Sequence, residues 1–340
     1  MPKADAIEYE VGNRTVRLSS PDKVYFPERG YTKRDVFEYY LAVGEPMLRY
    51  IHDRPCAMQR FPDGIDGEMF FQKRIPSRGT PDWITTATIE FPSRRKAEEL
   101  CPTELAHIPW AAQMSAVVFH PWPVRAPLVD NPDELRIDLD PQPGTDFADA
   151  ARIAVDHLRE VLDEAGMVGF PKTSGGRGVH VYVRIRPEWS FIDVRHAAIA
   201  LALKLEQRDP DHVTSAWWKE ERGTRVMVDY NQMARDRTIA SPYSLRANAR
   251  ATASMPVSWD ELSDVEPNDF DLRTVPKRLL EKGDAFEQLD SKAYGIETLL
   301  EWFASQGREM PYPPDYPKMP GEPPRVQPSK KVAANWENVR

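Results

Sequence analysis

Two acidic residues one strand step apart are the first candidates for a catalytic site. In residues 135–140 (LRIDLD) apolar and polar residues alternate strictly. Alternate residues of a strand point to the same face, so Asp138 and Asp140 share a face. Two such carboxylates repel each other unless a cation lies between them. Mg²⁺ or Mn²⁺ suits this position, since either binds carboxylate oxygens and can also bind substrate phosphates. The alternative is the solvated face of an edge strand.

A third carboxylate, Asp229, is predicted on a second strand. Residues 224–230 (TRVMVDY) alternate so that Met227 and Asp229 share one face. Three carboxylates on neighbouring strands can hold two metal ions about 3.5–4 Å apart, which suits in-line displacement at phosphorus. A single strand aspartate is often merely exposed, so Asp229 indicates such a site only together with the other two.

The glycine-rich segment 174–180 (SGGRGVH) is a candidate anion-binding turn. Its glycines would let backbone N–H groups approach an anion, while Ser174 adds a hydroxyl and Arg177 a positive charge. His180 then lies at the start of the following strand. The segment matches neither the GK[ST] phosphate loop nor the GxGxxG dinucleotide turn. A plain glycine-rich hairpin turn explains it equally well.

Other basic and aromatic residues are weaker candidates. Arg237 and Arg246 could reach a triphosphate or could be surface charge, and His120 could equally be a hydrogen-bonded histidine at a strand end. Phe70 and Phe71 are adjacent in a predicted strand, so we expect one in the core and the other free to stack on a base.

Two lysines near the start of the chain suit a terminal phosphate. Thr32 is a predicted helix N-cap, Lys33 lies in the first turn of that helix, and Lys23 lies in the preceding turn. A helix N-terminus with two lysines favours phosphate binding, although lysines ten residues apart are usually just solvated.

Regular elements that would position these residues alternate along the chain. Residues 50–125 are rich in proline and aromatic residues and predict short strands joined by turns. The other predicted elements are a strand at 14–18, helices at 147–164 and 193–207, and an acidic helical region at 260–303. Eight prolines in residues 311–340 exclude a regular helix or a central strand there. We therefore expect a catalytic domain at 1–310 and a proline-rich tail at 311–340.

Composition predicts a cytoplasmic globular protein. Hydrophobic residues make up 41% and charged residues 29% of the 340. The sequence shows no apolar run of the ~18 residues that a membrane span needs and no signal peptide. Cys56 and Cys101 are too few for a disulfide framework. A net charge of −8 argues against nucleic-acid binding, but residues 172–250 carry 14 basic against 9 acidic side chains. Net charge therefore excludes neither a protein that binds nucleic acid nor one that does not.

Taken in order, these motifs resemble the polymerase domain of bacterial DNA ligase D and its stand-alone relatives, within the archaeo-eukaryotic primase superfamily. The resemblance covers residues 12–295. Its segments are SPDKVYFPERGYTK (20–33), MFFQK (69–73), LRIDLDP (135–141), FPKTSGGRGVHVY (170–182), VDYNQ (228–232) and TIASPYSLR (238–246).

The resemblance implies an α+β fold with a primase-type catalytic core, in which two mixed β-sheets form a central cleft flanked by helices. It implies template-dependent nucleotidyl transfer, in which a primer 3′-hydroxyl attacks the α-phosphate of an NTP or dNTP. Members commonly use Mn²⁺, with Mg²⁺ as the alternative, at a two-metal site, and they often prefer ribonucleotides. The implied partners are gapped or broken DNA and repair ligase or end-bridging proteins, with no membrane, in a bacterial nucleoid.

The resemblance also assigns roles to individual residues. Asp138, Asp140 and Asp229 match the metal-binding carboxylates. The nucleotide-binding positions are His120, Ser174, Arg177, His180, Arg222, Gln232, Arg237 and Arg246. Lys23 and Lys33 match lysines that bind a downstream 5′-phosphate, while Phe70 and Phe71 match residues that stack on the template.

The chain departs from the family pattern at two positions, and three functions remain open. Ser20 replaces an expected Asn, and Gln59 replaces an expected Lys, which weakens the implied phosphate or nucleotide grip. No ligase lysine motif or nuclease module is found, so we expect a stand-alone enzyme. The three functions are a gap-filling primase-polymerase, an end-joining polymerase that works with a separate ligase, and a catalytically idle DNA-binding scaffold. The intact carboxylate set argues against the scaffold.

Overall fold

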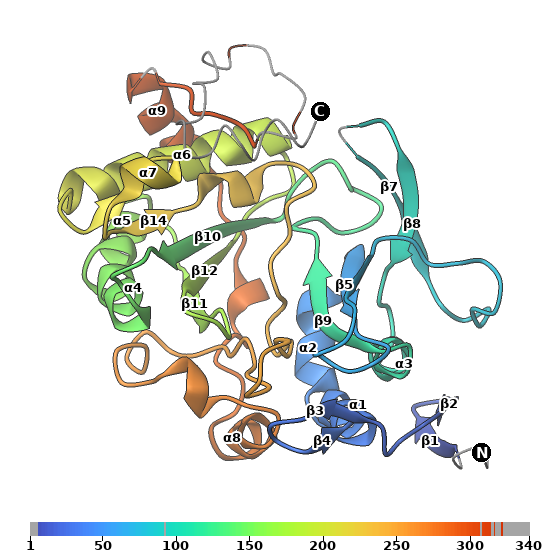
Figure 1. Ribbon diagram of the computed structural model, residues 1–340. Helices are drawn as coiled ribbons and strands as arrows, with labels where there is room; N and C mark the ends of the chain where they lie inside the picture. The colour runs from blue at the N-terminus through green and yellow to red at the C-terminus, as the bar shows by residue number, and fades with distance from the viewer. Residues whose placement is uncertain (1–5, 92, 307, 314–315, 317–320, 322–340) are drawn as a thin grey trace.

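The computed structural model describes residues 6–91, 93–306, 308–313, 316 and 321, and it contains two five-stranded sheets (Figure 1). The first sheet has the order β11 (Phe170–Thr173), β12 (Val179–Arg184), β10 (Glu134–Pro141), β14 (Val226–Val228) and β13 (Val213–Thr214). It is mixed, because β13 and β14 are parallel and its other pairs antiparallel.

The second sheet is formed by strands from the first half of the chain. Its order is β6 (Phe70–Gln72), β5 (Cys56–Arg60), β8 (Lys96–Leu100) and β7 (Thr86–Glu90), and β9 (Ala116–Pro121) also pairs with β5. All pairings described for this sheet are antiparallel. The two-sheet α+β architecture agrees with the expected fold, although only the first sheet is mixed.

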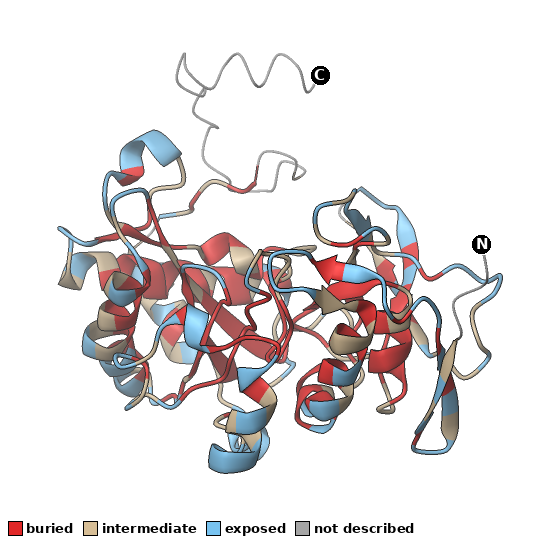
Figure 2. Ribbon diagram, turned by 60° about the horizontal axis from the view of Figure 1, so that its bottom comes forward, coloured by how far each residue is buried: buried red, intermediate tan, exposed pale blue. Residues whose placement is uncertain are grey.

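Strand β10 has the predicted alternation. Leu135, Ile137 and Leu139 are buried, and they pair with the valines of β12, whose side chains lie on the same face. Helices α4 (Phe147–Ile153), α5 (Arg159–Glu164) and α6 (Phe191–Arg208) flank this sheet, and their buried residues extend its core (Figure 2). The polar residues of β10, which include Asp138 and Asp140, lie on the opposite face of the strand.

The structure also contains helices, short strands and turns outside these two sheets. Helix α1 (Lys33–Ala42) has Thr32 as its N-cap. The Thr32 side chain accepts a hydrogen bond from the Asp35 N–H, as the predicted N-cap requires. The other elements are β1 (Ile7–Val11), β2 (Arg14–Leu18), β3 (Val24–Phe26), β4 (Tyr31–Thr32), α2 (Gly44–Ile51), α3 (His107–Gln113), η1 (Ala154–Leu158), α7 (Lys219–Arg222), η2 (Tyr230–Met233), η3 (Pro267–Asp269), α8 (Thr274–Lys282), η4 (Leu289–Ser291) and α9 (Glu297–Gln306).

Three secondary-structure predictions need correction. Helix α3 lies within the region predicted as strands and turns, and the predicted helix 147–164 contains the π-helical turn η1. The acidic region 260–303 holds only α8, the start of α9 and short 3₁₀ turns. Pro267 begins one of these turns, and Gly283, at φ +74°, ends α8. These residues break the helical pattern that composition alone suggested.

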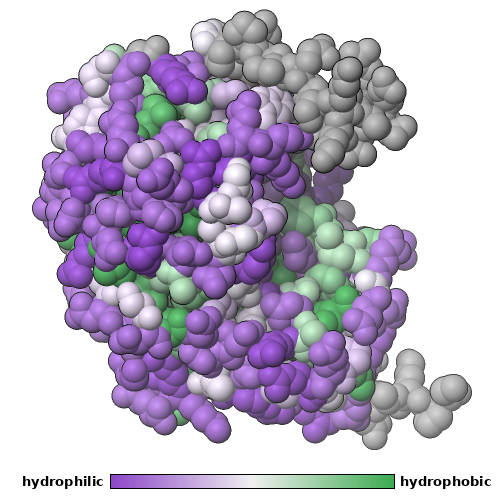
Figure 3. All heavy atoms as spheres, turned by 60° about the vertical axis from the view of Figure 1, so that its left-hand side comes forward, coloured by the Kyte–Doolittle hydropathy of each residue, from purple (hydrophilic) through white to green (hydrophobic). Residues whose placement is uncertain are grey.

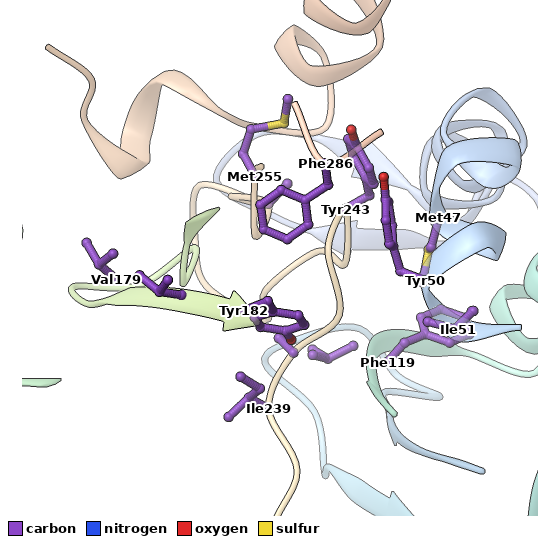
Figure 4. Packing of buried hydrophobic residues seen from close by; sticks show 14 of the residues in the cluster. Met47, Tyr50, Ile51, Phe119, Val179, Tyr182, Ile239, Tyr243, Met255 and Phe286 are labelled. Atoms are coloured by element: carbon purple, nitrogen blue, oxygen red, sulfur yellow. The ribbon is translucent and has the colours of Figure 1, made fainter. Parts of the chain in front are cut away.

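Aromatic side chains join the parts of the molecule that contain the two five-stranded sheets into one core (Figure 4). The ring of Phe286 lies 5.8 Å from that of Tyr182 on β12 and 5.7 Å from that of Tyr50 on α2. Tyr50 also stacks with Tyr243, and both hydroxyls donate to Asp284. The surface of the molecule is nevertheless hollowed on one side, where apolar side chains are exposed (Figure 3). Among the described helices, none is long and apolar enough to cross a bilayer.

Candidate active site

Strand register places four of the chemically active residues in one row. Asp138 on β10 pairs directly with His180 on β12, and His180 pairs with Lys172 on β11. On the other side of β10, the Asp229 N–H donates to the Asp138 carbonyl, 2.9 Å away, just beyond the end of β14. Asp140 pairs with Met227. The strands therefore bring together the three carboxylates and His180. The alternation predicted that Asp138 and Asp140 share a face, and the register adds Asp229 and His180 to it.

The carboxylates are crowded and only partly exposed, with 14% of the Asp138 side chain accessible. Burial, and then the charges of Asp229 and Asp140, raise the pKa of Asp138 to about 8. Burial also raises the pKa of Asp229, against the opposing effects of the Asn231 N–H and Arg222. Few donors relieve Asp138, which accepts one hydrogen bond from Gln232 Nε2 at 3.1 Å and has His180 Nε2 at 3.5 Å. A cation is the missing partner that this arrangement favours.

These donors fit a hard divalent cation. Carboxylate oxygens are the preferred ligands of Mg²⁺ and Mn²⁺. Asp138, Asp140 and Asp229 supply such oxygens from two adjacent strands. In the part of the chain that the structure describes, no three His, Cys, Asp or Glu side chains already stand in metal-ligand geometry.

Positive charge and N–H donors lie beside the carboxylates. Lys172 Nζ contacts His180 Nδ1 at 2.8 Å and donates to the Ala240 carbonyl at 3.0 Å. Burial, and then Arg246 and Arg136, hold the pKa of Lys172 well below its usual range. Arg136 is paired with Glu134 at 2.6 Å, whereas Lys172 and Arg246 form no ion pair with a carboxylate among the described residues. Such cations suit a polyanion such as a triphosphate.

His120 adds unsatisfied polar atoms to this pocket. The side chain is buried, and neither ring nitrogen makes a well-formed hydrogen bond among the described residues. Burial, and then the charge of Arg246, lower the pKa of His120 to about 3. A buried histidine without partners is costly unless a ligand supplies them. The alternative, that His120 is hydrogen-bonded at a strand end, has only a weak contact with the Thr238 backbone to support it.

The glycine-rich segment is the turn of the β11–β12 hairpin, as one of its two interpretations expected, and its role in anion binding stays a prediction. Ser174 Oγ accepts hydrogen bonds from the Gly176 and Gly178 N–H groups, each at 3.1 Å. Those two donors are used inside the turn, and the Ser174 hydroxyl proton remains for a ligand. Gly175 has φ +70°, and a Cβ there would lie 2.6 Å from Arg246 Cγ. The turn thus allows Arg246 to approach closely, while Arg177 at its tip donates weakly to the Pro141 carbonyl at 3.4 Å.

The other predicted nucleotide-binding residues lie around the carboxylates. Arg222 Nη1 donates to Gln142 Oε1 at 3.2 Å, and the charges of Asp229 and Asp140 act on its guanidinium. Arg237 is also close enough to influence Asp229 electrostatically. Gln232 contacts Asp138, as described above.

Phe70 and Phe71 are both exposed, by 49% and 42%, which corrects the expectation that one would be in the core. The reason is that β6 is a three-residue strand at the edge of its sheet, paired only with β5 among the described strands. The ring of Phe71 lies 5.5 Å from that of His120. The strand alternation was correct, but neither face of this short strand is covered.

The lysine pair forms a separate basic pocket. Lys33 Nζ donates to the Ser19 carbonyl at 3.0 Å and to Gln113 Oε1 at 2.9 Å, and the half-exposed Lys23 pairs with Asp63 at 2.7 Å. Burial, and then the charges of Lys23 and Arg60, lower the pKa of Lys33 to about 8. Three cations therefore lie near one another.

Two features of this region bear on the sequence predictions. Ser20 has φ +51°, a left-handed conformation that Asn adopts more readily than Ser, which gives a backbone reason for the expected Asn. Neither Arg60 nor Lys172, which lies beside His180, was predicted as a site residue. Both residues lie on strands, and only the pairing of those strands with their neighbours shows which side chains lie beside them.

Comparison with known proteins identifies the family of this chain. The family model described as the LigD primase-polymerase domain matches residues 32–286. The multifunctional non-homologous end joining DNA repair protein LigD of Mycobacterium tuberculosis is 34% identical over 295 residues, which cover 84% of this chain and 38% of that protein. The bifunctional non-homologous end joining protein LigD of Bacillus subtilis is 29% identical over 273 residues, which cover 80% of this chain and 43% of that protein. The chain thus spans well under half the length of these relatives.

A solved structure supports the same relationship. The polymerase domain of Mycobacterium tuberculosis ligase D, determined in complex with DNA, matches with a TM-score of 0.76 and 34% identity over 82% of this chain and 99% of that domain. The primase-type α+β fold expected from the sequence is confirmed by this match. The chain therefore belongs to the family of LigD primase-polymerase domains, which are DNA-directed nucleotidyltransferases.

Proposed function

We propose that this chain is a DNA primase-polymerase that adds nucleotides, preferably ribonucleotides, to primer 3′ ends at short gaps or breaks during bacterial DNA repair. The observation that supports this proposal is the row of crowded carboxylates beside Lys172, Arg246 and the unpaired ring nitrogens of His120. The DNA repair names of the relatives and the DNA in the solved domain support it. The unit that performs the reaction is 1–310. The proline-rich tail 311–340 lies mostly outside the described residues.

The reaction joins the primer 3′-oxygen to the α-phosphorus of the incoming nucleotide, and pyrophosphate leaves. Asp138, Asp140 and Asp229 would hold two Mn²⁺ or Mg²⁺ ions, which neutralise phosphate charge and orient the attacking and leaving oxygens. Arg246 and His180 would bind and orient the triphosphate. In the neutral state favoured by its low pKa, His120 can offer both a donor and an acceptor.

The choice of DNA end would come from the other two predicted sites. Lys23 and Lys33 would bind the 5′-phosphate across a gap, while the exposed rings of Phe70 and Phe71 would stack on the template. An end-joining polymerase that bridges double-strand breaks in trans with a separate ligase is the second candidate, which the end-joining names of the relatives favour. Ligase and end-bridging proteins would then be its partners.

Primer extension on a short gapped duplex with Mn²⁺ tests the proposal. We expect synthesis that is faster with ribonucleotides and with a 5′-phosphate on the downstream strand. Synthesis only when two broken ends are supplied together would favour the end-joining polymerase. Tight DNA binding without synthesis on any substrate would support the idle scaffold instead.

Replacing Lys23 with alanine should reduce the preference for a phosphorylated gap. Loss of one charge-assisted contact to phosphate is worth about 1–2 kcal/mol, a factor of roughly 5–30. The measurement is the ratio of kcat/KM on phosphorylated and unphosphorylated gaps. Arg34→Ala, which removes the exposed partner of Asp22 in the same region, is the control. An equal loss of activity on both gaps would show that Lys23 has another role.

The phosphate preference should also depend on pH. Because Lys33 has a pKa of about 8, it is cationic below that pH and loses its charge as the pH rises through it. The preference should therefore be largest near pH 7 and decline towards pH 9, and the ratio of the two substrates cancels pH effects on catalysis. Lys33→Arg keeps its charge over this range. The same decline in that variant would show that Lys33 is not the titrating group.

A further inference from the structure

A buried cation outside the site binds the C-terminal segment that we call the strap, residues 309–312. Arg195 on α6 is fully buried. Its Nη1 donates to Glu309 Oε1 at 2.6 Å, and its Nη2 donates to two backbone carbonyls of the strap at 2.9 and 3.0 Å. The guanidinium also lies 3.6 Å from the ring centroid of Tyr312. A buried guanidinium needs such a set of partners, so the strap is held specifically.

The strap has a second anchor on the same helix. His196 Nε2 lies 2.6 Å from Glu309 Oε2, and the His196 ring stacks on Phe303 of α9 with centroids 4.0 Å apart. Glu309 thus bridges two consecutive residues of α6 with its two oxygens. The strap lies beyond residues 32–286, to which the family model is matched.

Asn231 connects the strap to the carboxylates. Its Oδ1 accepts from Arg195 Nε at 2.8 Å, and its Nδ2 donates to the Pro311 carbonyl at 3.0 Å. Its backbone N–H donates to Asp229 Oδ1 at 2.9 Å. The side chain is almost fully buried, and both its polar atoms are used in holding the turn η2 between α6 and the strap.

The turn η2 needs such support. It is a single 3₁₀ turn of four residues, with Asp229 as its N-cap and Gln232, which contacts Asp138, in its last part. Short 3₁₀ turns have poor hydrogen-bond geometry and little stability of their own. The like charges of Asp229, Asp138 and Asp140 also favour moving this turn away from β10. A contact from outside the sheet is therefore required to hold Asp229 in place.

We infer that the strap positions Asp229 for divalent-cation binding, through Glu309, Arg195 and Asn231. This inference rests on the proposed function, in which Asp229 is a metal ligand. Glu309 and Arg195 are positioning residues, because neither contacts the reacting atoms. The catalytic unit would then need residues beyond the part that the family model covers.

The test is the affinity of the full chain for Mn²⁺, measured by electron paramagnetic resonance of free Mn²⁺ without DNA or nucleotide. We expect Glu309→Ala to weaken Mn²⁺ binding by roughly 10-fold, as loss of support for a metal ligand does, and to lower kcat more than it changes the nucleotide KM. Glu309→Gln, which keeps an acceptor for Arg195, should recover part of both. Glu297→Gln is the matched control, because it removes an exposed ion pair with Arg186 at the start of α9.

The inference would be overturned if Glu309→Ala had the same Mn²⁺ affinity and the same kcat as Glu297→Gln. If Glu309→Ala does not fold, Glu309→Gln is measured in the same way against Glu297→Gln, with a smaller loss of Mn²⁺ affinity and kcat expected and no loss overturning the inference. Asp229→Ala separates this result from the proposed function. Unchanged Mn²⁺ binding and synthesis in Asp229→Ala would show that the site itself is wrongly assigned. Loss of both in Asp229→Ala but not in Glu309→Ala would refute only the role of the strap.

Discussion

Asp138→Asn is expected to abolish nucleotide addition while leaving the affinity for gapped DNA unchanged. Asn has the same shape as Asp but cannot supply a charged ligand, and the ligand lost is the central carboxylate of the three. We expect kcat to fall by on the order of 10³-fold or more, which corresponds to about 4 kcal/mol of transition-state stabilisation.

The same substitution should make the metal-free protein more stable. Asp138 is buried beside two other carboxylates, and the neutral amide removes both the repulsion and the cost of burying a charge. A higher unfolding temperature than wild type in EDTA is the expected result. Asp163→Asn, an exposed substitution on α5, is the control and should change neither property.

Loss of DNA binding in step with synthesis, or a lower unfolding temperature in EDTA, would contradict this account of Asp138. The first would indicate a folding defect or a direct DNA contact. The second would show that the carboxylate makes stabilising interactions that burial and its neighbours do not predict.

Arg54→Met should have the largest effect on stability. Arg54 on the loop before β5 is fully buried and pairs with Asp133 at 2.5 Å and with Glu134 at 2.9 Å. Burial alone would raise the pKa of Glu134. The charges of Arg54, Arg136 and Arg184 nevertheless hold this pKa well below its usual range. These acidic residues begin β10, so the cluster joins the second sheet to the strand that carries Asp138.

Met removes the buried hydrogen bonds that Arg54 donates to the Tyr50 carbonyl and to Asp133 and its contact with Glu134, and it leaves those buried acceptors with fewer donors. We therefore expect the free energy of unfolding to fall by about 3–5 kcal/mol. Urea denaturation in EDTA measures this change. Arg34→Met removes an ion pair with Asp22 in which both side chains are largely exposed, and it should cost about 0–1 kcal/mol. A loss for Arg54→Met no larger than that of this control would show that the cluster does not hold the sheets together.

Several features could be predicted from the sequence because local rules determine them. The alternation in residues 135–140 places Asp138 and Asp140 on one face, and Thr32 begins α1, because each depends only on residues a few positions apart. The resemblance to the ligase D polymerase domain added the family and the fold, which the comparisons confirm. The roles of the individual site residues stay predictions.

Tertiary structure decided the rest, because it depends on contacts between distant segments. The register of β11, β12 and β10 placed Lys172 beside His180 and His180 beside Asp138, and no local pattern shows which residues meet across strands. The exposure of Phe70 follows from what covers β6, and the partners of Arg195 in the strap lie more than a hundred residues further along the chain. The sequence by itself determined which residues share a face, and only the packing of distant elements decided what that face meets.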